Sequence, residues 1–341
     1  MQGQAPEVIN FSGLKLFRQC PNLYKERYID GTYTPEQKDY FLYGSLVDAM
    51  LTDPTNVDNR FVMVSRKKDV SPLELASKKN ELEQEISGLL EKASAGNKTA
   101  QKGINSRQTK IAEIDEQLAD VNENESREQV TPSMWHDASE TAEAIADLDL
   151  WKRLTKAAHI FQPSLESTSL KRRGTLDVLS GSAPVIQLYR LCFVEKTIAY
   201  EEFRKAVNEL PEADRWLVIA DAKTTKDLKE FNAQKVSEMY AGQLSYYRSL
   251  VRDIFGIEPA CVIIAADKAN GFKMAQEYLF EASTLDWADN ATKTIEEAFW
   301  RCAATGEWPA AKEISGSAQE CFTCSKCRVR PHSKTDLPCL V

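Results

Sequence analysis

The apolar run at residues 216–220 leads directly into Asp221-Ala222-Lys223. The run is typical of a buried strand, and strand side chains alternate between two faces, so Asp221 and Lys223 share a face. Burying a carboxylate and an ammonium there is costly unless they serve a metal or a substrate. A salt bridge on an edge strand is the alternative. The ordered neighbours of this tripeptide favour the chemical interpretation.

Two further carboxylates precede it. Asp177 ends the segment Gly174-Thr175-Leu176-Asp177, and Glu166, eleven residues earlier, is expected on the partner strand. Phosphodiester hydrolysis needs an activated water and neutralised charge on the phosphate, and one or two Mg²⁺ or Mn²⁺ ions held by carboxylates supply both. We expect Asp177 and Asp221 to share an ion at adjacent strand ends. Glu166 is a candidate ligand of the metal or of its water.

The neighbours of Asp221 complete the expected site. The side chain of Ala222 points away, but its backbone carbonyl can be a further metal ligand. Lys223 can orient the water or stabilise charge on the phosphate in the transition state. Gln243 and Tyr247 are spaced i, i+4 on a predicted helix, so they share one face. We expect this face to point towards the metal centre or the substrate backbone, although an ordinary amphipathic helix would give the same spacing.

The elements that must position these residues can be read from apolar periodicity and helix caps. A helix is predicted over 11–28 with Ser12 as its N-cap, and a second over 43–51. An amphipathic helical pattern covers 131–158, and two short strands are predicted within 164–180. Further predictions are strands over 216–222, 259–266 and 278–280, and helices over 235–255 and 287–305. This order predicts an α/β or α+β fold around a central mixed sheet flanked by helices.

The segment between about 75 and 121 differs in composition. Apolar residues recur there at steps of three, four and seven, with charged and amide residues between them. This spacing predicts a coiled-coil-like helical hairpin turning near Gly96, which could bind a partner or substrate, promote self-association, or be purely structural. We expect an N-terminal helical part at 1–65, this insertion at 66–130, a catalytic core at 131–310 and a cysteine-rich tail at 311–341.

Bulk properties restrict the class of protein. The chain has 341 residues and a formal net charge of −8, which argues against a protein that coats nucleic acid by bulk charge. A local basic cluster, Lys171-Arg172-Arg173, is a candidate DNA contact, and a solvated surface is the alternative. Neither a long apolar run nor a secretory signal is evident, so we expect a cytoplasmic protein without a membrane segment.

The segment 11–309 resembles the PD-(D/E)XK nuclease superfamily, in the branch of RecE-type exonucleases. The resemblance is carried by these pieces: Phe11-Ser-Gly-Leu-Lys15, Pro21-x-x-Tyr24, Tyr43-Gly-Ser-Leu-Val-Asp48, Leu51-x-Asp-Pro54, Glu166, Arg173-Gly-Thr-Leu-Asp177, Asp221-Ala-Lys-Thr-Thr225, Gln243-Leu-Ser-Tyr-Tyr247 and Gly306-Glu-Trp-Pro309. It implies a restriction-endonuclease-like core and a magnesium-dependent exonuclease that degrades DNA from an end, usually 5′ to 3′. By carry-over Asp177 and Asp221 bind metal, Lys223 is catalytic and Glu166 is ancillary. The family often has His where this chain has Asp48, so Asp48 either binds a cation or has left the site.

Eight cysteines are present. Cys192, Cys261 and Cys302 lie in apolar contexts typical of core thiols. The run Cys321-x-x-Cys324-x-x-Cys327 can hold three corners of a [4Fe–4S] cluster, with Cys20 as a remote fourth ligand. This split resembles the iron–sulfur nucleases of the AddB and CRISPR-adaptation kinds, where the last gap is longer, so Cys339 is an alternative to Cys327. A Zn²⁺ site made by the four tail cysteines, or free thiols, are the other interpretations.

Three functions are compatible with these observations. The first is an exonuclease for recombination or DNA end processing, phage or prophage related, which works with a single-strand annealing protein and assembles as a homo-oligomer. The second is an iron–sulfur end-trimming nuclease of the CRISPR-adaptation kind. The third is a nuclease-fold DNA-binding adaptor without catalysis, against which the intact Asp177, Asp221 and Lys223 argue.

Overall fold

A computed structural model describes residues 6–33, 39–64, 72–94, 97–123, 127–268 and 273–309. The chain divides into two compact units, one formed by the residues up to 52 together with those from 139 onwards, the other by residues 53–138. Among the described residues, no helix is long and apolar enough to cross a membrane. The predicted tail at 311–341, with Cys321, Cys324, Cys327 and Cys339, lies outside the described residues.

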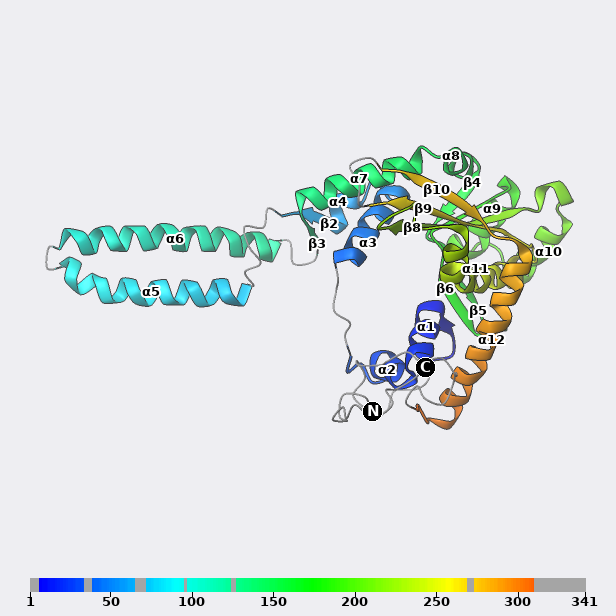
Figure 1. Ribbon diagram of the computed structural model, residues 1–341, viewed down its shortest axis with the longest axis horizontal. Helices are drawn as coiled ribbons and strands as arrows, with labels where there is room; N and C mark the ends of the chain where they lie inside the picture. The colour runs from blue at the N-terminus through cyan, green and yellow to red at the C-terminus, as the bar shows by residue number, and fades with distance from the viewer. Residues whose placement is uncertain are drawn as a thin grey trace. The chain divides into compact units, whose positions relative to one another are not determined.

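The larger unit is a mixed α/β structure built on two sheets (Figure 1). Its five-stranded sheet has the order β10-β9-β8-β7-β4, in which only β8 and β9 run parallel. These strands are β4 (Ala158–Phe161), β7 (Val178–Gly181), β8 (Leu217–Thr225), β9 (Ala260–Asp267) and β10 (Ala275–Leu279). A three-stranded sheet has the order β1-β6-β5, from β1 (Ile9–Asn10), β5 (Ser164–Ser167) and β6 (Arg172–Thr175).

The helices of this unit are α1 (Phe11–Gln19), α2 (Pro21–Tyr28), α3 (Asp39–Thr52), α8 (Asp149–Lys156), α9 (Ala183–Tyr189), α10 (Tyr200–Glu209), α11 (Ala233–Phe255) and α12 (Ala282–Thr305). A π-helical turn, η1 (Arg190–Val194), extends α9, and a 3₁₀ turn, η2 (Glu212–Asp214), precedes β8. Helix α7 (Pro132–Ala146) links the two units in the sequence.

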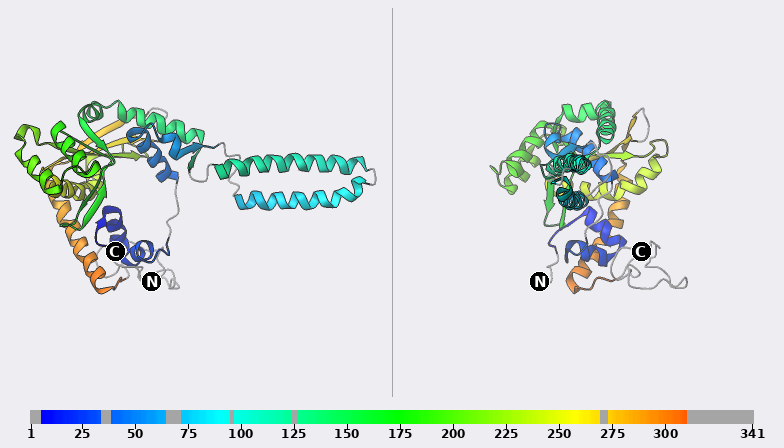
Figure 2. Two further views of the ribbon diagram at one scale, coloured as in Figure 1. Left: turned by 180° about the vertical axis from the view of Figure 1, so that it is seen from behind. Right: turned by 90° about the vertical axis from the view of Figure 1, so that its left-hand side faces the viewer.

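Helices cover both faces of the five-stranded sheet (Figures 1 and 2). Leu179 and Ile219 are opposite one another in the β7–β8 register and belong to the main core together with Leu244 of α11. On the other face, the hydroxyl of Ser180 donates a 3.0 Å hydrogen bond to the carbonyl of Leu154 on α8. Because side chains alternate along β7, α8 and α11 lie on opposite sides of the sheet.

The long helix α11 has an end signal at each terminus. The side chain of Asn232 accepts a hydrogen bond from the backbone N–H of Lys235, which satisfies one donor of the first turn. At the other end Gly256 adopts φ 69°, a left-handed conformation that glycine reaches without a Cβ penalty. The predicted helix over 235–255 is therefore confirmed within two residues.

The predicted helix over 11–28 was wrong in two respects. It is divided into α1 and α2 because Pro21 forces Cys20 into an extended conformation, with φ −163° and ψ 110°. The N-cap is Asn10, whose side chain accepts a 2.6 Å hydrogen bond from the N–H of Gly13, and not Ser12.

The region 164–180 contains three strands where two were predicted. β5 and β6 form a hairpin in the smaller sheet, and β7 enters the five-stranded sheet two residues later. The strand predicted from Trp216 begins one residue later, and Trp216 itself is 41 % exposed. The strand predicted over 278–280 corresponds to β10, which is an edge strand of the five-stranded sheet and pairs only with β9 among the described strands.

The smaller unit contains a hairpin of two long antiparallel helices, α5 (Pro72–Ser94) and α6 (Lys98–Glu123). Ion pairs join Lys79 to Asp115 at 2.6 Å and Glu85 to Arg107. The later residue of α5 thus pairs with the earlier residue of α6, as expected for antiparallel helices. The helix α4 (Val57–Arg60) and a two-stranded parallel sheet of β2 (Phe61–Met63) and β3 (Glu128–Val130) belong to the same unit.

Candidate active site

Asp177 and Asp221 lie side by side where β7 begins. Asp177 immediately precedes β7, whereas Asp221 lies in the middle of β8, which continues to Thr225 and does not end at residue 222 as predicted. Val178 of β7 is opposite Ala220 of β8 in an antiparallel register, which places Asp177 beside Asp221. The backbone N–H of Ala222 donates a 2.8 Å hydrogen bond to Oδ2 of Asp177, so the strand that carries one carboxylate also holds the other.

Lys223 contacts both carboxylates. Its Nζ forms an ion pair with Oδ2 of Asp221 and lies 3.8 Å from Oδ2 of Asp177. The side chain of Asp221 is almost fully buried, whereas those of Lys223 and Asp177 are about a quarter exposed, at 23 % and 25 %. The site is thus closed behind Asp221 and open to solvent on the side of Asp177 and Lys223.

Charge accumulates at this point. Burial and, after it, the charge of the neighbouring Asp177 together raise the pKa of Asp221 from 3.8 to about 7, against the opposing effect of Lys223. The two carboxylates in turn hold the pKa of Lys223 above its ordinary value in spite of burial. The ammonium therefore stays protonated at neutral pH, and it does not fully offset the negative charge that the acidic side chains bring together.

Helix α11 presents one face to these carboxylates. The amide of Gln243 donates a 3.1 Å hydrogen bond to Oδ1 of Asp221, and it also lies 3.3 Å from the hydroxyl of Tyr247. Burial, followed by the charge of Asp221, raises the pKa of Tyr247 to about 12, so its hydroxyl is protonated at neutral pH. The shared face predicted for Gln243 and Tyr247 is directed at the acidic pair.

A close approach of backbone and ring fixes Tyr247. A Cβ added at Gly174 of β6 would lie 2.8 Å from Cε1 of Tyr247, closer than real Cβ contacts allow. Glycine is therefore the residue that lets the tyrosine ring lie against β6. Through this contact the strand leading to Asp177 and the helix carrying Gln243 are held together.

Asp48 joins the site from α3. Its Oδ2 accepts a 2.6 Å hydrogen bond from the amide of Gln162, which also donates to Thr52 at 3.2 Å. The backbone N–H of Gln162 donates to the carbonyl of Asp177 at 3.0 Å, so one residue links α3 to the acidic pair. Asp48 is near enough for its charge to contribute to the raised pKa of Asp221.

Glu166 stands apart from this group. It lies on β5 opposite Arg173 of β6, on the expected partner strand, and is exposed. Among the described residues, no hydrogen bond or ion pair joins Glu166 to Asp177, Asp221 or Lys223.

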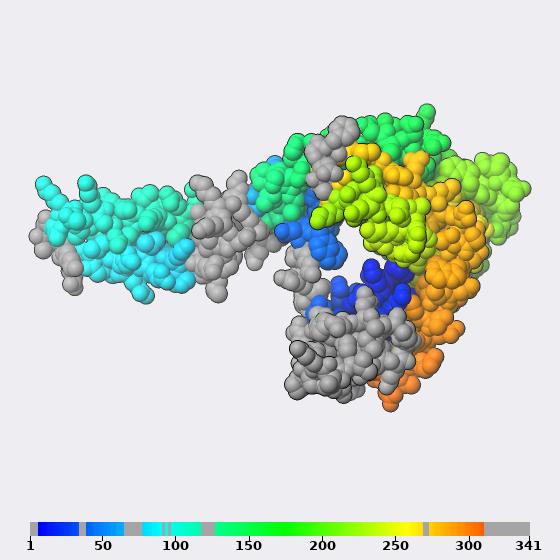
Figure 3. Space-filling model, viewed as in Figure 1, coloured from blue at the N-terminus to red at the C-terminus, as the bar shows by residue number. Residues whose placement is uncertain are grey.

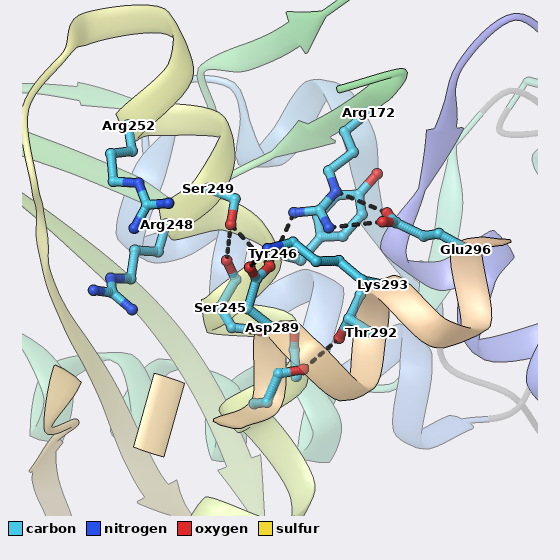
Figure 4. Close-up of polar contacts among 12 residues, drawn as sticks. Arg172, Ser245, Tyr246, Arg248, Ser249, Arg252, Asp289, Thr292, Lys293 and Glu296 are labelled. Carbon is cyan, nitrogen blue, oxygen red and sulfur yellow. Dashed lines mark hydrogen bonds and ion pairs between the residues drawn. The ribbon is translucent and has the colours of Figure 1, made fainter. Parts of the chain in front are cut away.

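The basic cluster needs a correction. Lys171 and Arg173 are exposed, but Arg172 is only 2 % exposed and faces the interior (Figure 4). Its guanidinium donates two 2.7 Å hydrogen bonds to the carboxylate of Glu296 and lies 3.3 Å from Asp289. Alternation along β6 turns the middle residue of the cluster inwards, and α12 supplies the carboxylates that allow a buried arginine. Arg172 is therefore not a surface DNA contact.

Two residues of the site had not been expected. Gln162 adopts φ 50° in the turn between β4 and β5, and no sequence signal points to it. The ring of Tyr240 lies 5.9 Å from Nζ of Lys223. Tyr240 precedes Gln243 by three residues and Tyr247 by seven, so the helical period could have included it.

The donor set fits a hard divalent cation. Carboxylate and carbonyl oxygens are the ligands that Mg²⁺ and Mn²⁺ take, and a carboxylate whose pKa is raised by burial and by its acidic neighbour would gain from a bound positive charge. Within the described residues no group of three His, Cys, Asp or Glu side chains is already gathered at ligand spacing. Two carboxylates with a lysine between them are what the chain itself provides.

Cys20 lies at the junction of α1 and α2 and is fully buried. Cys261 and Cys302 are buried in the core and Cys192 packs against it, as predicted for core thiols. The other proposed ligands of a cluster lie in the tail outside the described residues, so the iron–sulfur site stays a prediction.

Comparison with known proteins shows a likeness in structure. No family model matches the chain, and no curated protein does. The fold is similar to the crystal structure of a protein named "Putative exonuclease" from Eubacterium rectale, with a TM-score of 0.51 and 13 % sequence identity. The match covers 97 % of this chain and 92 % of that one. At this identity the likeness shows a shared fold.

Proposed function

We propose that this protein is a metal-dependent DNA exonuclease that hydrolyses phosphodiester bonds from DNA ends. The observation that carries the proposal is the convergence of Asp177, Asp221 and Lys223 where the start of β7 lies beside β8. The fold shared with a protein named as an exonuclease supports it.

Mg²⁺ or Mn²⁺ would be held by Asp177, Asp221 and the backbone carbonyl of Ala222, with Asp48 as a further candidate. Such an ion, when bound, neutralises phosphate charge and lowers the pKa of water to generate a nucleophile. Lys223, protonated and partly exposed, is placed to hold a phosphate oxygen or to orient the attacking water. Gln243 and the N–H of Ala222 fix the orientation of the two carboxylates.

The finer features of the proposal rest on the resemblance to RecE-type enzymes. They are 5′ to 3′ polarity on duplex ends, a role in recombination or end processing in a phage or prophage setting, a single-strand annealing partner and a homo-oligomeric assembly. A [4Fe–4S] cluster held by Cys20 and the tail cysteines, with Zn²⁺ as the alternative, would have a structural role.

A time course on linear duplex labelled at its 5′ or 3′ ends tests the proposal. We expect the wild type to release label from linear DNA with Mg²⁺ or Mn²⁺, to leave a covalently closed circle intact, and to stop on addition of EDTA. Asp221→Asn keeps the size of the side chain and should lower the rate by at least about 10²-fold, the loss typical of removing one electrostatic group from an active site.

Two outcomes would contradict the proposal. If Asp221→Asn digests DNA at the wild-type rate, the site is wrongly assigned. If the folded wild type binds DNA ends but hydrolyses none in either metal, the protein is a DNA-binding adaptor. A matched Lys223→Met variant, which keeps the length of the side chain without its charge, should lose activity while still binding the ends.

A further inference from the structure

An exposed pair of aromatic side chains stands at the start of α3. Tyr40 and Phe41 are 49 % and 58 % exposed, and their ring centroids lie 4.2 Å apart with an angle of 40° between the planes. Single exposed apolar residues are ordinary, but two large rings in contact form a continuous aromatic surface with two tilted faces. Such a surface suits a ligand with flat faces of its own.

Helix geometry aligns this pair with the acidic site. Phe41 precedes Asp48 by seven residues, so both lie on one face of α3, separated by about 10 Å along its axis. Gly44 lies between them, and a Cβ added there would be 4.0 Å from Oγ1 of Thr224, the residue after Lys223. This face of α3 therefore lies along the last residues of β8, with Asp48 at the acidic site and Phe41 at the far end. Helix α3 contacts β8, and in Figure 3 the blue surface of α3 adjoins the yellow-green surface near the end of β8.

Positive charge accompanies the rings. Lys268 follows β9, and its backbone N–H donates a 3.0 Å hydrogen bond to the carbonyl of Thr225 at the end of β8. Its Nζ lies 5.8 Å from the ring centroid of Tyr40 and 5.7 Å from that of Tyr43. Tyr43 is buried and held by a 2.6 Å hydrogen bond to Thr141, so the lysine is kept beside a fixed ring.

We propose that Tyr40, Phe41 and Lys268 form a platform for the unpaired bases of a DNA end, a proposal that rests on the proposed function. Bases stack on exposed aromatic rings with about 1–3 kcal/mol each, whatever their sequence, and a nearby lysine contacts the phosphates. An aliphatic protein surface would match this combination less well because it offers no negative charge to the lysine, and an acidic one because it offers no flat faces to the rings.

The geometry also gives a register. A stacked strand advances about 3.4 Å per nucleotide, so about 10 Å along α3 corresponds to roughly three nucleotides. The base on Phe41 is thus expected about three nucleotides from the part of the strand that passes Asp48. Because stacking needs a free base face, the platform engages frayed or single-stranded ends in preference to paired ones.

The test measures stacking without hydrolysis. Duplexes with a short single-stranded tail carry 2-aminopurine at successive tail positions, and binding is followed in EDTA by quenching of its fluorescence. The wild type should quench one tail position most strongly. A double variant, Tyr40→Ala with Phe41→Ala, should lose that maximum and bind the tail roughly 10- to 100-fold more weakly, the effect of losing one or two stacked bases.

Matched variants separate stacking from general damage. Phe41→Trp keeps a flat ring and should retain the quenching. Trp287→Ala removes another exposed aromatic, 72 % exposed on α12, and should bind like the wild type. Thermal unfolding of all variants shows whether each is folded.

The outcomes are distinguishable from those of the proposed function. If the double variant quenches and binds the tail like the wild type, the platform is refuted, whatever the activity. If the wild type fails to hydrolyse DNA with Mg²⁺ or Mn²⁺ but quenches through Phe41, the proposed function fails and the platform remains. Equal loss of binding in Trp287→Ala would also overturn the platform, since the effect would not be specific to α3.

Discussion

The backbone N–H of Ala222 and the Oδ2 atom of Asp177 are joined by a 2.8 Å hydrogen bond. One lone pair of the more exposed carboxylate is thereby tied to the strand that carries the more buried one, Asp221. The side chain of Asp177 is thus oriented by a main-chain donor in addition to the longer ion pair with Lys223. Preorganised ligands of this kind reduce the rearrangement needed when a cation binds.

The stability of the metal-free protein should depend on pH through Asp221. Its folded-state pKa is raised from 3.8 to about 7, so between these values the folded state binds more protons than the unfolded state. Stability must then fall as pH rises through this window and level off above it. Thermal unfolding in EDTA between pH 4 and 8 measures the trend, and the matched Asp221→Asn protein should show a smaller fall.

Magnesium should reverse this loss. A cation that binds the folded state stabilises it by mass action, and at a concentration of about 100 times its Kd the gain is about 2.7 kcal/mol. At pH 8 the wild-type unfolding temperature should therefore rise with added Mg²⁺, and that of Asp221→Asn should rise much less. Equal rises in the two proteins would place the cation elsewhere.

Arg172 and Arg173 should behave oppositely although they are adjacent. Arg172→Ala would leave Glu296 buried without its bidentate partner, and we expect a loss of about 3–5 kcal/mol of unfolding free energy. Arg173→Ala should leave stability nearly unchanged, because the side chain is exposed, and should reduce the salt dependence of DNA binding. Denaturant unfolding and binding isotherms at several salt concentrations check both. A surface role for Arg172 would follow if its variant were fully stable and defective only in binding.

Gly174→Ala should weaken activity through Tyr247. The added Cβ would displace the ring that neighbours Gln243, and we expect a cost of about 1–3 kcal/mol with reduced hydrolysis. Gly88→Ala is the control, because a Cβ there meets nothing within 4 Å in the middle of α5. That variant should be more stable by about 0.5–1 kcal/mol, with activity unchanged. Wild-type rates for Gly174→Ala would show that the position of Tyr247 is not needed.

The metal bound through the cysteines can be identified by its composition. A brown protein with four iron atoms per chain, lost in Cys20→Ser, is expected for a [4Fe–4S] cluster. One zinc per chain, retained in Cys20→Ser, would indicate the tail site instead. Cys261→Ser, which alters a buried core thiol, is the control and should keep the metal content.

Much of the fold could be predicted from the sequence because strong periodicity and end signals coincide, as at Asn232 and Gly256 around α11. Interactions between residues distant in the sequence could not be predicted in this way. Arg172 reads as one of three surface cations until α12 places Glu296 against it, 124 residues away. The break at Cys20 was visible in the following proline but was outweighed by the apolar pattern around it.

The residues of the acidic site likewise fall into those that local sequence rules predict and those that they do not. The order of Asp177, Asp221, Lys223, Gln243 and Tyr247 indicated a common site, because strand alternation and helix period are local rules. The position of Gln162 in the site could not be predicted, because it depends on a left-handed turn and on a partner in α3, 114 residues away.

The antiparallel pairing of α5 with α6 determines how the hairpin can change in length. If both helices gain or lose the same number of turns at the end where they meet, the contacts closer to β2 and β3, including that of Lys79 with Asp115, keep their partners. The hairpin can therefore change in length without loss of these contacts, provided that both helices change together. A matched change in the length of α5 and α6 is therefore expected to leave β2, β3 and the ion pair of Lys79 with Asp115 in place.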